Sequence, residues 1–141
     1  MKRDLLDPGL RSLIDAPSPA TLTLYQEDGE AVTSPVWFRF AGDQFEVVVA
    51  AADAKLAHLR RDPRCVLLVF EVVRPFRGIM VRATASIVPD ERARARLAIA
   101  SRYLGDDAGR AYADTSRRHP GFVIRLPLAE VRAWDLADKL P

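Results

Sequence analysis

The stretch VVVAAADAKLAHLRRDPR, residues 47–64, contains the change of pattern that decides the fold. Its β-branched run predicts a strand buried on both faces. After the alanines at 50–52, residues 54–61 predict a short helix that ends at Asp62-Pro63, because the residue before a proline avoids helical backbone. Lys55 falls at the start of that helix, where free amides and a flexible ammonium both attract anions. The stretch is therefore a candidate anion site, and a solvated helix end with an ordinary surface lysine is the alternative.

Charge and cysteine content narrow the class of protein. The 141 residues include 21 Lys+Arg and 19 Asp+Glu, a net charge of +2, and only Lys2, Lys55 and Lys139 are lysines. So small a net charge argues against nucleic acid or an anionic membrane as the main partner. The single cysteine, Cys65, cannot form an internal disulfide, and no signal-peptide pattern is present, so we expect a cytoplasmic protein. Cys65 lies in an apolar run and should be buried.

Short strands with turn signals extend outward from this stretch on both sides. Asp28-Gly29 predicts a hairpin turn, and Pro35 should occupy an edge or bulge position. The sequence shows no long alternation of strands and helices, which argues against a Rossmann sheet. The pattern predicts an α+β chain, mainly β, whose six to seven antiparallel strands form a closed barrel with short helices outside. These strands are expected at residues 20–26, 32–40, 45–51, 65–72, 79–88, 121–128 and 130–136.

Three further helices are expected around the barrel. Asp7 and Pro8 predict the start of one, Asp90 and Gly105 bracket another, and residues 107–120 predict a shorter polar one. Arg92, Arg94 and Arg96 on the second are interpreted as a solvated face. The chain, residues 1–141, should form a single domain, with residues 1–9 as a flexible N-terminal arm.

Several kinds of catalytic motif are missing. The chain has neither GxGxxG nor the Walker phosphate loop, so it lacks the standard nucleotide-binding loops. With only His58, His119 and one cysteine, we expect no metal site and no Ser-His-Asp triad. His119 stays open as an axial haem ligand. The absence of these motifs leaves the catalytic residue unknown.

Five segments, by their order along the chain, carry a resemblance to a known family: DGEAVTSPVWF (28–38), FEVVVAAADAKLAHLRRDPRCVLLV (45–69), IMVRATASIVPD (79–90), SRYLG (101–105) and FVIRLPLAEVRAWD (122–135). The order resembles that of the split β-barrel flavin and deazaflavin oxidoreductases, the pyridoxamine 5'-phosphate oxidase-like fold, and within it the F420-dependent branch. The likeness covers roughly residues 10–135.

The resemblance implies a homodimer with each of two cofactors in a groove at the interface, contacted by both barrels. It implies hydride transfer between reduced F420 and a small organic substrate, with Arg77, Tyr103 or solvent open as the proton donor. FMN is the alternative cofactor, in a flavin reductase or oxidase, and a non-catalytic flavin- or haem-binding module is the other alternative. The cofactor-binding residues it implies are Ser34, Pro35, Val36 and Trp37 along the ring, Arg39, Lys55, Arg60 and Arg61 toward the phosphate, and Ala50, Ala51 and Ala52 where the backbone is approached.

Two departures from the family qualify this inference. Asp53 stands where many relatives have a basic residue, and we interpret it as a helix cap rather than a phosphate contact. Ala83 replaces a glycine common in relatives, which would narrow the groove. The C-terminus, VRAWDLADKLP (131–141), lacks the Arg/His substrate signature of pyridoxamine phosphate oxidases, which argues against that activity itself.

Overall fold

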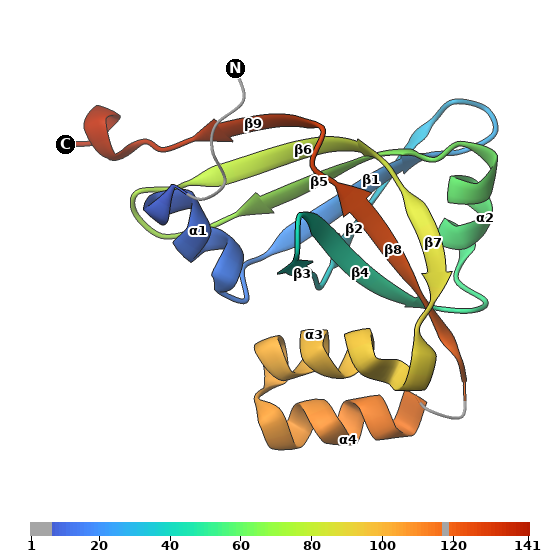
Figure 1. Ribbon diagram of the computed structural model, residues 1–141. Helices are drawn as coiled ribbons and strands as arrows, with labels where there is room; N and C mark the ends of the chain where they lie inside the picture. The colour runs from blue at the N-terminus through green and yellow to red at the C-terminus, as the bar shows by residue number, and fades with distance from the viewer. Residues whose placement is uncertain (1–6, 117–118) are drawn as a thin grey trace.

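The computed structural model describes residues 7–116 and 119–141, which form nine strands in two antiparallel sheets. The larger sheet has the order β2-β1-β5-β6-β9 and the smaller has the order β3-β4-β8-β7 (Figure 1). Together they confirm the predicted α+β antiparallel barrel, with β2 and its Pro35 at a sheet edge. The strands are β1 (Ala20–Tyr25), β2 (Ala31–Val36), β3 (Arg39–Ala41), β4 (Gln44–Ala50), β5 (Arg64–Phe70), β6 (Gly78–Thr84), β7 (Ser86–Pro89), β8 (Gly121–Pro127) and β9 (Glu130–Trp134).

The expected number of six to seven strands is wrong, because two expected strands each divide in two. The strand expected over 32–40 breaks at Trp37 and Phe38 into β2 and β3, and that over 79–88 breaks at Ala85 into β6 and β7. In both cases the halves belong to different sheets, so the chain turns a corner of the barrel there. Alternation of side chains continues through such a bend, and the sequence pattern therefore gives no sign of it.

Four α-helices lie outside the sheets in the described residues: α1 (Pro8–Asp15), α2 (Ala54–Arg61), α3 (Arg94–Leu104) and α4 (Asp106–Ser116). The bounds of α2 match the prediction. The Asp7 carboxylate accepts a hydrogen bond from the Gly9 amide at 2.9 Å. Residues 7–9 are thus the capped start of α1, which corrects the predicted arm over 1–9, and residues 1–6 lie outside the described part. Helices α3 and α4 form a hairpin joined at Gly105, whose φ of 86° favours glycine (Figure 1).

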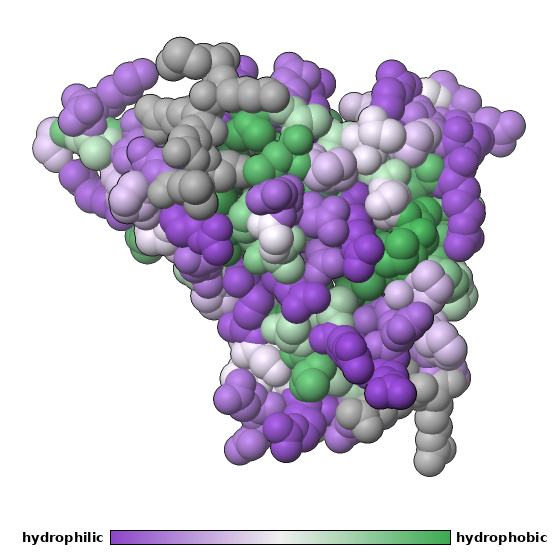
Figure 2. All heavy atoms as spheres, viewed as in Figure 1, coloured by the Kyte–Doolittle hydropathy of each residue, from purple (hydrophilic) through white to green (hydrophobic). Residues whose placement is uncertain are grey.

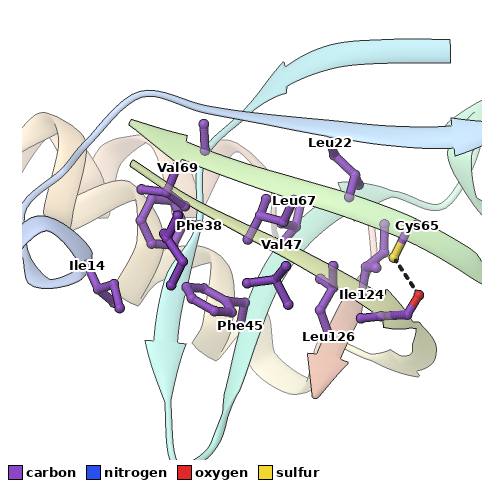
Figure 3. Close-up of a cluster of buried hydrophobic side chains, with 14 of the residues drawn as sticks. Ile14, Leu22, Phe38, Phe45, Val47, Cys65, Leu67, Val69, Ile124 and Leu126 are labelled. Carbon is purple, nitrogen blue, oxygen red and sulfur yellow. Dashed lines mark hydrogen bonds between the residues drawn. The ribbon is translucent and has the colours of Figure 1, made fainter. Parts of the chain in front are cut away.

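The core lies between the inward faces of the two sheets (Figure 3). Leu22, Leu67 and Val69 of the larger sheet meet Phe45 and Ile124 of the smaller one, and all five side chains are fully buried. Burial of each such side chain contributes roughly 1.5–3 kcal/mol to folding.

Hydrophilic residues cover most of the face seen in Figure 2, and hydrophobic residues reach that surface in separate patches. No helix in the part of the chain that the structure describes has the length and apolarity needed to cross a membrane.

Cys65 is buried, as predicted, and 2% of its surface is exposed. Burial raises the pKa of its thiol from 9.0 to about 12. We therefore expect iodoacetamide at pH 8 to leave the folded protein unmodified and to alkylate Cys65 in guanidinium chloride, because the thiolate is the nucleophile. Mass spectrometry of both samples measures this, and labelling of the folded protein at the unfolded rate would contradict it.

The folded chain holds this proton to higher pH than the unfolded chain, so this contribution to stability falls as pH rises from 9.0 toward about 12.

Arg102 of α3 hydrogen-bonds to the C-terminal end of α1 and so connects α1 to the α3–α4 hairpin. Its guanidinium donates hydrogen bonds to the carbonyl oxygens of Ile14 at 3.1 Å and Ala16 at 2.8 Å, and it lies over the Phe38 ring. A cation at a helix C-terminus stabilises the free carbonyl groups there. This contact fixes the segment leading into β1, which forms part of the cavity described next.

Candidate cofactor site

A cavity of about 1010 Å³ opens beside β4, between the barrel and the α3–α4 hairpin. Small-molecule sites are concave, largely apolar and about 300–1,000 Å³ in volume, so this one is large enough for a cofactor. Its apolar wall comes from the starts and ends of strands, and its polar groups come from the helices and the segment before β8. The lining residues are Pro17, Pro19, Ala20, Thr21, Pro35, Val36, Trp37, Val47, Val48, Val49, Ala50, Asp53, Lys55, Phe70, Arg96, Ile99, Ala100, Tyr103, Tyr112 and His119.

Lys55 reaches this cavity from the first turn of α2. After β4 the chain turns tightly, with the Asp53 amide donating to the Ala50 carbonyl oxygen at 3.0 Å. The Asp53 carboxylate accepts a hydrogen bond from the Lys55 amide at 2.9 Å, which confirms it as the N-cap of α2. The Lys55 ammonium lies 3.5 Å from the same carboxylate, and 22% of the side chain is exposed. A cation, a helix N-terminus and a cap are thus brought together at one end of the cavity.

The end of β2 forms the opposite part of the wall. Pro35 and Val36 line it, and the Trp37 indole stacks on the Tyr103 ring with centroids 5.1 Å apart and planes 9° apart. The Tyr112 ring lies 5.6 Å from the same indole in a tilted arrangement. Trp37 is 38% exposed, so the predicted ring contact is available at its free surface, while Tyr103 covers one face.

Tyr103 is held in place at its hydroxyl. The phenol donates a hydrogen bond to the Ser18 carbonyl oxygen at 2.8 Å, and burial raises its pKa. Arg77, the other side chain considered as a proton donor, instead pairs with the Glu71 carboxylate at 2.7 Å and does not line the cavity. Of these two candidates, only Tyr103 is near the site.

Of the predicted cofactor residues, Pro35, Val36, Trp37, Ala50 and Lys55 line the cavity. The three small residues among the others do not line it, and two of the three lie exposed in the turn after β4. They are Ser34, Ala51 and Ala52.

The three predicted arginines are also engaged away from the cavity. Arg39 pairs at 2.7 Å with Glu46, a buried carboxylate that Arg125 approaches at 3.1 Å. Arg60 lies over the Phe122 ring, and Arg61 donates a hydrogen bond to the Tyr25 carbonyl oxygen at 2.7 Å. This cavity gives their predicted phosphate role no support.

The sequence interpretation missed Arg96 in particular, which it assigned to a solvated face. Arg96, Ala100 and Tyr103 follow the i, i+4, i+7 spacing of one helix face, and all three line the cavity. That spacing was the available signal. Tyr112 comes from α4, where no periodic pattern pointed to a site, whereas His119 had been considered as an axial haem ligand. In the described residues no three His, Cys, Asp or Glu side chains group as a metal site would require.

Solved structures share this fold at low sequence identity. A conserved hypothetical protein from Mycobacterium tuberculosis superposes with a TM-score of 0.81 at 22% identity, over 100% of this chain and 94% of that one. An F420 reductase gives 0.70 at 21% identity, over 86% and 94%. The heme storage protein of Vibrio cholerae gives 0.68 at 14% identity, over 90% and 93%.

No curated protein matches the sequence. The family model described as pyridoxamine 5'-phosphate oxidase matches residues 6–135, nearly the whole chain. The chain therefore belongs to the pyridoxamine 5'-phosphate oxidase family.

Proposed function

We propose that this protein is an oxidoreductase that binds the deazaflavin F420 in the cavity beside β4. The observation that carries the proposal is the position of Lys55, a cation on the first turn of α2 at the edge of an apolar cavity. A phosphate is stabilised by a helix N-terminus and an ammonium, and a flat conjugated ring by apolar walls. One of the similar folds is that of an F420 reductase. When bound in its reduced form, the cofactor would supply a hydride to an organic substrate, and the protein would supply orientation and charge.

The residues that line the cavity suit both the flat ring and the phosphate of such a cofactor. Pro35, Val36 and Val48 give the cavity a largely apolar strand wall, and Lys55 and Arg96 give it positive charge. The partner proposed with this function is a second copy of the chain, with the cofactor between the two. A measurement of mass in solution should therefore give twice the 15.7 kDa of one chain. The compartment that we propose is the cytoplasm.

Tryptophan quenching by F420 and by FMN, titrated in parallel, tests the proposal. We expect micromolar F420 to quench emission from Trp37, which lines the cavity, whereas Trp134 lies on β9. Trp37→Phe should abolish the quenching and Trp134→Phe should preserve it. Quenching that persists in Trp37→Phe and disappears in Trp134→Phe would show that the ligand binds elsewhere.

Other results of the same titration favour the alternatives. Preferential FMN binding would make the protein a flavin reductase or oxidase of the same fold. A non-catalytic haem-binding role has one observation in its favour, since His119 lines the cavity and a structure of similar fold is a heme storage protein. A Soret band that His119→Ala removes would support that role. Binding of none of the three would overturn the proposal.

A further inference from the structure

Arg96 is a cation that the fold directs into the cavity. It lies near the start of α3, is half-buried, and lines the cavity with Lys55. A Cβ on Gly121 would lie 2.8 Å from Arg96 Nη2 and 2.9 Å from the Val49 carbonyl oxygen. Gly121 pairs with Ala50, the last residue of β4. The guanidinium therefore packs over the end of β4, from which the chain turns toward Lys55.

The backbone of Arg96 is held by a buried carboxylate. Asp90 is 9% exposed and accepts hydrogen bonds from the amides of Ala95 at 2.9 Å and Arg96 at 3.1 Å. Its own amide donates to the Gly121 carbonyl oxygen at 2.9 Å, which ties this helix start to β8. Arg92 and Ala93, with φ of 57° and 54°, take the left-handed conformation to reach this geometry. Strain of this kind persists only where surrounding contacts enforce it.

The guanidinium of Arg96 has no carboxylate partner in residues 7–116 and 119–141. The other partly buried arginines do have acceptors. Arg39 and Arg125 share Glu46, Arg77 pairs with Glu71, and Arg102 binds main-chain carbonyl groups. A partly desolvated cation that faces a cavity without a counter-ion is a site for an anionic ligand group.

We propose that Arg96 and Lys55 together bind the phosphate group of the ligand in this cavity. This inference rests on the proposed function and adds a second phosphate-binding residue, from α3, in place of Arg39, Arg60 and Arg61. Asp53 offsets part of the charge of Lys55, so Arg96 supplies the positive charge that an anion needs there. A guanidinium also offers a planar pair of donors that matches two phosphate oxygens.

The test compares Arg96→Gln with Arg94→Gln, which removes the same charge from an exposed position of the same helix. Each variant is titrated with F420 and, separately, with the deazaflavin chromophore of F420 without the phosphate-containing tail. Arg96→Gln should weaken F420 binding roughly 10- to 100-fold, the loss expected for one charge-assisted hydrogen bond, and leave binding of the truncated chromophore unchanged. Arg94→Gln should change neither, and Arg96→Lys should recover part of the loss. Equal F420 affinity in the two glutamine variants would overturn the inference.

Inorganic phosphate separates this inference from the proposed function. At equal ionic strength, replacing chloride by phosphate should raise the Tm of the wild-type protein and of Arg94→Gln, because a ligand that binds the folded state stabilises it. Arg96→Gln should lack that shift. If F420 fails to bind while phosphate gives this pattern, the proposed cofactor is wrong and the anion site stands. If phosphate stabilises all three proteins equally, or none, Arg96 is not part of an anion site.

Discussion

Replacing Lys55 with alanine is expected to weaken F420 binding roughly 10- to 100-fold. The substitution removes the ammonium that lies 3.5 Å from the Asp53 carboxylate. That carboxylate then keeps its full negative charge beside the ligand anion. Repulsion by that carboxylate adds to the lost attraction. Lys55→Arg should retain part of the affinity, because charge is kept while donor geometry changes. Fluorescence titration of each variant gives the Kd.

Lys139→Ala is the matched control for this substitution. Lys139 is the other lysine in the described residues, is exposed, and lies at the end of the chain in the short 3-10 helix Ala137–Lys139. Lys139→Ala removes the same charge from the whole protein as Lys55→Ala does, and it leaves the cavity unchanged. If both variants lose affinity equally, the effect is one of net charge and the phosphate role of Lys55 is wrong. Attraction at the site itself should also weaken as salt is raised.

Leu67→Ala is expected to lower the free energy of unfolding by about 2–5 kcal/mol. Leu67 lies in the middle of β5, is 0% exposed, and points at the opposite sheet (Figure 3). Its removal costs the transfer free energy of the lost methyl and methylene groups plus the cavity left in a closely packed interior. The Tm should fall by roughly 10 °C.

Leu104→Ala controls for the chemistry of the substitution. Leu104 ends α3 and is 42% exposed, so the same truncation should change stability by less than about 0.5 kcal/mol. Denaturant unfolding of both variants at a fixed pH measures the difference. Similar values for Leu67→Ala and Leu104→Ala would mean that the space between the sheets is not the core.

Local signals in the sequence predicted what local chemistry determines. The helix over Ala54–Arg61, its Asp53 cap and the edge position of Pro35 all follow from backbone rules that act over a few residues. The corners at Trp37 and Ala85 depend instead on closure of the barrel, to which strands distant in sequence contribute. No window of neighbouring residues contains that information.

Arg96 illustrates the same limit within the site. A helix beginning directly at Asp90 would have placed Arg92 and Arg96, at i and i+4, on one face, which was interpreted as solvated. The left-handed residues Arg92 and Ala93 instead delay the helix to Arg94, and Asp90 reaches across them to cap it. Two consecutive left-handed residues without glycine are not foreseeable from composition, because tertiary contacts enforce them.

The fastening of α1 by Arg102 bears on the order in which the chain folds. Its hydrogen bonds to Ile14 and Ala16 join residues 88 and 86 positions apart. A helix of eight residues is marginal in water by itself. Although α1 is synthesised before every other described helix, it gains this partner only once α3 exists and has docked on the barrel. Leu10, Leu13 and Ile14 of α1 also pack in the core between the sheets, so this first helix draws its stability from segments that are all synthesised after it.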